Sequence, residues 1–94
     1  MLKDLLPSEF HLSQNYPNPF RDRTTIKYCV PQKCRIVLSI HRSSGKKVER
    51  LVDEEKDAGT YEAVWDAKNE MPGVYVCLLK ASHFQAAKKM ILRH

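Results

Sequence analysis

The side chains that could act as nucleophiles or metal ligands are few, and their spacing matches no known metal site. The three cysteines, Cys29, Cys34 and Cys77, lack the CxxC spacing of zinc sites, and the four histidines form no HxH or HxxxH pair. Cys29 and Cys77 lie inside apolar runs, so we expect buried, unreactive thiols there. In an oxidising compartment, a Cys29–Cys77 disulfide across the fold stays open as a second possibility.

The carboxylates are also poorly placed for catalysis. Asp53, Glu54 and Glu55 are consecutive, and neighbours in a strand point to opposite faces, so they cannot form the facing pair of a glycosidase. Asp66, Asn69 and Glu70 offer only two or three oxygens, without the spacing of a known calcium loop. None of the motifs GxSxG, GxxxxGK[ST], HExxH or GxGxxG occurs. We therefore expect no enzyme activity, no metal and no cofactor.

Length and charge narrow the function classes further. Ninety-four residues make one small domain, which leaves little room for a deep catalytic cleft. The net charge of +5 is spread along the chain without a basic patch interleaved with aromatic residues, so nucleic-acid binding is not expected. No apolar run is long enough to span a membrane. The first residues lack the apolar core of a signal peptide, so we expect either a cytoplasmic protein or a piece of a longer secreted precursor.

Alternating apolar residues predict short strands along most of the chain. The pattern is clearest where Ile26, Tyr28 and Val30 fall on one face. The predicted strands are 24–30, 34–40, 47–52, 59–66, 74–80 and 84–92. A helix over 46–56 is the competing prediction, because its charges suit i,i+4 pairs, but its apolar face is narrow. We expect Gly45 to take a positive φ in a turn.

These strands predict an all-β fold, an immunoglobulin-like antiparallel β-sandwich of about seven short strands with no substantial helix. Residues 1–10 carry no periodic pattern and are interpreted as a linker remnant, and residues 11–94 as the sandwich domain. We expect the single tryptophan, Trp65, to fill the core between the sheets. A sugar-stacking platform is the functional alternative for Trp65.

The segment Leu12–Phe20 (LSQNYPNPF) stands apart from the strands. Pro17 and Pro19 exclude a helix interior or a central strand, and each favours an extended residue before it. We expect an extended segment that lies on the sandwich, with Tyr16 and Phe20 as its buried anchors.

Several segments together, in this order along the chain, resemble the C-terminal sorting domain of proteins secreted by the type IX system (the Por secretion system). The most specific of them is NYPNPF, and KKMIL closes the set. The segments are 6–20, 24–28, 44–52, 58–67, 72–79 and 88–92. The resemblance covers nearly the whole chain and implies an immunoglobulin-like domain attached to the end of a secreted protein.

The resemblance also implies a function. Such a domain is a non-catalytic sorting signal that directs an upstream cargo protein through an outer-membrane translocon. It folds in the periplasm of a gram-negative bacterium, and a sortase-like peptidase then cleaves before the domain, in the linker. The cargo is released or attached to the cell surface. The implied partners are thus the translocon, the peptidase and the covalently linked cargo, with no nucleic acid and no membrane insertion.

The resemblance places the recognition site at the final strand. Its terminal signal segment corresponds to Lys88, Lys89, Met90, Ile91 and Leu92, in which Lys88 and Lys89 are expected to face solvent. Gly73 and Tyr75 are expected to shape the neighbouring strand and belong to the same predicted site. The family signature is expected to pack rather than to bind; its residues are Asn15, Tyr16, Pro17, Asn18, Pro19, Phe20 and Trp65.

Two other functions stay open at this point. A non-catalytic immunoglobulin-like accessory module of a secreted enzyme would bind carbohydrate or a neighbouring domain, and it would need an exposed aromatic platform. A structural assembly domain like that of flagellar hook-capping proteins shares the pattern from Ala58 to Tyr75. Such a domain explains neither NYPNPF nor the KKMIL terminus.

Overall fold

The computed structural model describes residues 6–94, so the first half of the predicted linker lies outside the described residues. The described chain contains seven strands and no helix. They are β1 (His11–Leu12), β2 (Arg23–Val30), β3 (Cys34–Arg42), β4 (Lys47–Lys56), β5 (Gly59–Asp66), β6 (Gly73–Ala81) and β7 (Phe84–Leu92). Accordingly, residues 6–94 include no helix that could cross a membrane.

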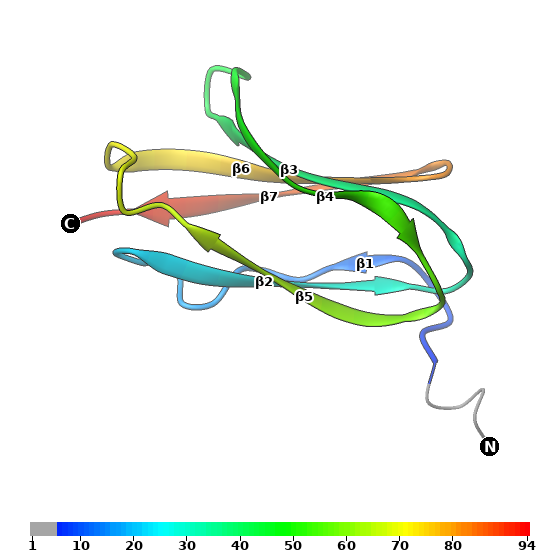
Figure 1. Cartoon of the computed structure of the whole chain (residues 1–94). Helices are drawn as coiled ribbons and strands as arrows, with labels where there is room; N and C mark the ends of the chain where they lie inside the picture. Colours follow the sequence, from blue (N-terminus) through cyan, green and yellow to red (C-terminus); the bar gives the residue numbers. More distant parts are fainter. Residues whose placement is uncertain (1–5) are drawn as a thin grey trace.

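The strands form two sheets that face each other (Figure 1). One sheet has the order β1-β2-β5 and the other β4-β3-β6-β7, and the paired strands of both sheets run antiparallel. The C-terminus and the start of β1 lie towards opposite ends of the long axis of the sandwich (Figure 1). The predicted all-β sandwich of seven strands is confirmed.

The faces of the strands follow the alternation in the sequence. In β2, the side chains of Ile26, Tyr28 and Val30 are buried, as predicted, because residues two apart in a strand share one face. β6 pairs with β3 on one side and β7 on the other. Its nearly continuous apolar sequence therefore belongs to an interior strand of the sheet.

The segment 46–56 is strand and not helix. β4 pairs with β3 over most of its length, with two register shifts along the ladder. The turn between these strands is closed by backbone hydrogen bonds between Arg42 and Lys46 (2.8 Å) and between Gly45 and Arg42 (2.8 Å). Gly45 has φ +98°, which confirms the predicted positive φ.

The centre of the core is aromatic. The indole of Trp65 is fully buried and contacts the rings of Phe20 (5.7 Å between centroids) and Tyr75 (5.1 Å). Its Nε1 donates a hydrogen bond to Glu49 Oε1 (3.2 Å), so the polar atom of the buried ring is satisfied. The predicted core role of Trp65 is confirmed, and the sugar-stacking alternative for Trp65 is wrong.

The segment 12–20 crosses from one sheet to the other. β1 pairs with β2, and Tyr16 continues this pairing by exchanging two backbone hydrogen bonds with Thr25 (2.9 Å each). Four residues later, Phe20 forms a parallel bridge with Leu92 of β7, in the opposite sheet. The peptide bonds before Pro17 and Pro19 are cis. The segment therefore closes the side of the sandwich at which β7 is the edge strand.

Candidate functional site

The edge of β7 is covered by the segment Gln14–Phe20, which we call the NYPNPF segment. Two of its side chains bind the backbone of the terminal strand. Gln14 Nε2 donates to the carbonyl oxygen of Lys89 (2.6 Å), and Asn18 Oδ1 accepts from the amide of Ile91 (2.9 Å). The most specific sequence motif and the predicted recognition strand, far apart in the sequence, are thus one structural unit.

Backbone hydrogen bonds extend this contact to the end of β7. The amide of Phe20 donates to the carbonyl oxygen of Ile91 (2.9 Å), and the amide of Arg93 donates to the carbonyl oxygen of Phe20 (2.9 Å). An edge strand normally leaves a row of unpaired donors and acceptors. Between Lys89 and Arg93 these groups are taken up by the NYPNPF segment, so this part of the edge is closed to strand addition.

A buried polar network holds the NYPNPF segment in shape. Asn15 Nδ2 donates to Thr24 Oγ1 (2.9 Å) and to the carbonyl oxygen of Pro17 (3.1 Å), and Thr24 Oγ1 donates to the same carbonyl (2.9 Å). Gln14 Nε2 donates to Asn15 Oδ1 (2.8 Å). Asn15 and Thr24 are both buried. Since buried amides need partners, Asn15 has a structural reason to occur at this position, as predicted.

The expectation that Tyr16 packs on the sandwich is wrong. Its side chain is 79% exposed, whereas that of Phe20 is 2% exposed. The reason is the register: Tyr16 lies opposite Thr25, and opposed residues of an antiparallel pair point to the same face, which here is the outer one. Pro17, Asn18 and Pro19 are exposed as well. The packing role thus belongs to Asn15 and Phe20.

The five residues of the terminal segment divide between two faces. Met90 and Leu92 are buried in the core, and Lys89 and Ile91 point outwards. Lys88 is half-buried on the same face as Met90, because it lies two residues before it. A partner that docks on the folded domain therefore cannot contact Met90 or Leu92. Lys89 faces solvent as expected, whereas the expectation that Lys88 also faces solvent is wrong, because Lys88 lies half-buried on the inner face.

Gly73 and Tyr75 shape the start of β6. Gly73 has φ +153°, a conformation that side chains rarely adopt. Tyr75 is buried, and its hydroxyl donates to the carbonyl oxygen of Met71. The guanidinium of Arg42 lies 5.7 Å from the centre of the Tyr75 ring. Direct contact of Tyr75 with a partner is therefore excluded in the folded domain, and its role is to pack.

The cysteines occupy different environments, and all three are free. Cys77 is buried, as predicted, but Cys29 lies half-buried on the outer face of β2 with its Sγ 3.7 Å from Thr60 Oγ1. The expectation of a buried Cys29 is wrong. The possible Cys29–Cys77 disulfide does not form either, because one thiol points away from the core and the other into it.

We expect Cys77 to make the domain less stable at alkaline pH. Burial raises the pKa of its thiol from 9.0 to about 12, while the thiol of the unfolded chain keeps its ordinary pKa. Between these values only the unfolded state loses the proton, so the free energy of unfolding falls as pH rises, by up to about 1.4 kcal/mol per pH unit. Urea unfolding followed by circular dichroism between about pH 8 and 11 measures this slope.

The control is Cys77→Ala, which is expected to flatten that slope, whereas Cys29→Ala leaves it unchanged. Equal slopes for Cys77→Ala and the unmodified chain would show that the Cys77 thiol titrates normally in the folded state.

One Ser–His pair was missed from the sequence. Ser39 Oγ lies 2.8 Å from His41 Nε2, and His41 Nδ1 lies 3.3 Å from the carbonyl oxygen of Gly45. The Ser-x-His spacing in a predicted strand is the signal that would have found it, because residues two apart share a face. An Nδ1–H donated to Gly45 makes Nε2 the acceptor. The pair lies on one face of β3, and the groove bordered by Tyr16 and Glu62 does not include it.

The three consecutive acidic side chains of β4, Asp53, Glu54 and Glu55, are engaged in ion pairs on its surface. Asp53 binds Arg35 (2.7 Å) and Arg50 (2.9 Å), and Glu54 binds Lys56 (3.1 Å). These groups do not form a facing pair of carboxylates.

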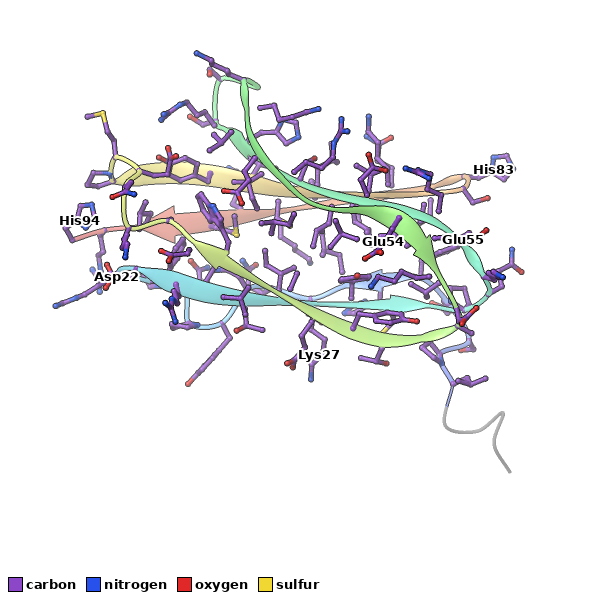
Figure 2. The ribbon with its side chains drawn as sticks, in the orientation of Figure 1. Asp22, Lys27, Glu54, Glu55, His83 and His94 are labelled. Carbon is purple, nitrogen blue, oxygen red and sulfur yellow. The ribbon has the colours of Figure 1, made fainter. Side chains whose placement is uncertain are left out.

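The remaining titratable groups are scattered over the molecule. Figure 2 shows His83 and His94 at opposite ends of the sandwich, and Lys27 pointing away from it. Among residues 6–94, no group of three or more potential metal ligands comes together. An open groove beside Tyr16 is bordered by Ser13, Gln14, Thr25, Lys27 and Glu62, and within it Lys27 Nζ lies 4.0 Å from Glu62 Oε2.

Comparisons with known proteins bear on both the fold and the terminal strand. The family model for the secretion system C-terminal sorting domain matches residues 14–93. No curated protein matches the sequence. Among solved structures, dimeric latent PorU from Porphyromonas gingivalis is similar with a TM-score of 0.64 and 20% identity, over 92% of this chain and 10% of the PorU chain. At that identity the likeness concerns the fold, and the chain spans about a tenth of the length of PorU.

Proposed function

The chain belongs to the family of secretion system C-terminal sorting domains, and on that premise we propose that it directs an attached cargo protein through the outer-membrane translocon of the type IX system. The domain itself is a sorting signal of a non-catalytic family, and a protein that carries it is exported to the cell surface or beyond. In this proposal the domain, residues 11–94, folds in the periplasm while the cargo is in transit. A sortase-like peptidase then cleaves in the linker before it.

The observation that carries the proposal is the contact between the NYPNPF segment and β7. Hydrogen bonds from Gln14 and Asn18 hold the backbone of the terminal strand in place, and Phe20 anchors the segment in the core. The terminal strand is therefore presented as a rigid element, which lowers the entropic cost of recognition by a partner. Lys89 and Ile91 are the residues of that strand that a partner can reach.

The similarity to PorU supports an appended module. A domain of this fold accounts for about a tenth of that longer protein, so the fold occurs joined to other domains. The accessory-module alternative finds less support, because Trp65 was its main candidate for a platform and this side chain is buried.

The test is export of a reporter. The full chain is fused to the C-terminus of a periplasm-targeted reporter in a bacterium that has type IX secretion. We expect the reporter at the cell surface or in the medium, and separated from the domain. The domain of a known cargo serves as the positive control and the reporter alone as the negative one. Retention in the periplasm, while the positive control is exported, would contradict the proposed function.

A further inference from the structure

The outer faces of the two sheets differ in composition. An antiparallel sheet with one solvated face is normally polar on that face. The sheet β1-β2-β5 has two large exposed apolar side chains on this face, Val64 and Tyr16, on either side of Thr25. Its other outward residues on β2 and β5 are Arg23, Thr25, Lys27, Cys29, Thr60, Glu62 and Asp66.

The outer face of β6 and β7 departs from the rule in another way, because apolar residues form a continuous row along β6. Val74 is 43% exposed and Ile91 is 42% exposed, and the two lie directly opposite each other across the strand pair. Val76 and Leu78 continue this apolar row along β6, half-buried. We call Val74, Val76, Leu78, Lys89 and Ile91 the β6–β7 face. The opposite sheet lies on the other side of β6 and β7 (Figure 1).

The charged side chains of β6 and β7 are all positive. β6 and β7 contain three lysines, Lys80, Lys88 and Lys89, and no aspartate or glutamate. Lys89 lies opposite Val76, so its ammonium group belongs to the middle of the apolar row. The carboxylates of the same sheet are on β4, where Asp53 and Glu54 are already paired with basic side chains. The face is thus complementary to a surface that is apolar and carries carboxylates.

A partner cannot add a strand to the edge of β7 between Lys89 and Arg93, because the NYPNPF segment already occupies this part of the edge. A partner must therefore reach this part of the strand through its outward side chains. We propose that the β6–β7 face docks a protein of the export machinery, with apolar side chains packed on Val74 and Ile91 and a carboxylate bound to Lys89. This inference rests on the proposed function and names the surface through which the export machinery would recognise the domain.

The experiment uses the reporter fusion with variants of the face. Val74→Thr combined with Ile91→Thr removes the exposed apolar pair and keeps residues that favour strands. Lys89→Glu independently reverses the charge. Each is expected to reduce the exported fraction roughly tenfold, as expected for loss of an interface anchor. Matched controls are Val64→Thr on the other sheet and Lys46→Glu in the β3–β4 turn, which are expected to be exported normally.

Thermal unfolding of the purified chain is measured for every variant, and we expect all of them to retain the midpoint of the unmodified chain within a few degrees. Normal export of both the Val74/Ile91 double variant and Lys89→Glu would overturn the docking face while leaving the proposed function intact. Failure of the unmodified fusion to be exported would overturn the proposed function and this inference with it.

A second measurement separates a protein partner from a lipid surface. The purified chain is mixed with vesicles of phosphatidylcholine containing phosphatidylglycerol, and bound chain is collected by sedimentation. We expect no binding above that of Lys46→Glu. Binding that is lost in Lys89→Glu but kept in Lys46→Glu would assign the face to an anionic membrane and overturn a protein partner.

Discussion

Replacing Phe20 with alanine is expected to lower the free energy of unfolding by about 3–5 kcal/mol. The side chain is almost completely buried and packs on the indole of Trp65. Truncation leaves a cavity where the NYPNPF segment crosses between the sheets, so the segment also loses its anchor beside Leu92. A small domain has a total stability of about 5–15 kcal/mol, so this loss is a large fraction of it.

The matched control is the other aromatic residue of the same motif. Tyr16→Ala is expected to change the free energy of unfolding by less than about 0.5 kcal/mol, because the side chain lies in solvent. Urea unfolding followed by circular dichroism measures both variants. Equal losses for the two variants, or a loss below about 1 kcal/mol for Phe20→Ala, would contradict the packing of the segment described above.

Replacing Trp65 with alanine is expected to have a comparable effect, about 3–5 kcal/mol, and to lower the melting temperature by tens of degrees. Trp65 joins the NYPNPF segment to β6, because its ring contacts both Phe20 and Tyr75. Its removal therefore weakens both elements that hold the terminal strand. Because Trp65 is the single tryptophan of the chain, circular dichroism and not fluorescence measures unfolding of this variant.

Two controls separate packing from hydrogen bonding at this position. Trp65→Phe keeps most of the apolar volume and loses the bond to Glu49, and Glu49→Ala loses the bond alone. We expect each to cost less than Trp65→Ala, and Glu49→Ala to cost about 1 kcal/mol or less, since Glu49 is exposed. A loss in Glu49→Ala as large as that in Trp65→Ala would show that the hydrogen bond, and not the aromatic cluster, dominates.

These variants also separate the two roles within the motif. Phe20→Ala and Trp65→Ala act on the stability of the whole domain, so their effect on export would follow from loss of the folded signal. Val74→Thr with Ile91→Thr acts on a surface that the folded domain leaves open. Export that is reduced at unchanged stability is therefore specific to the docking face.

The sequence alone was sufficient to predict the strands and most of the residues on their buried faces. Ile26, Tyr28 and Val30 illustrate the reason: the side-chain period of a strand is two residues, so a local pattern assigns each residue to a face. The core position of Trp65 followed from its size and apolar character in the same pattern. The absence of acidic residues from β6 and β7 is equally a property of the sequence.

Only the tertiary structure showed the features that depend on pairing between segments far apart in the sequence. Both Tyr16 and Phe20 follow prolines or asparagines in an extended segment, and the sequence offers no reason to bury one and expose the other. Pairing of Tyr16 with Thr25 turns its ring outwards, and pairing of Phe20 with Leu92 places its ring in the core. The same pairing brings the NYPNPF segment onto the terminal strand. The local sequence does not show which residues these backbone hydrogen bonds join, because the fold determines the partners.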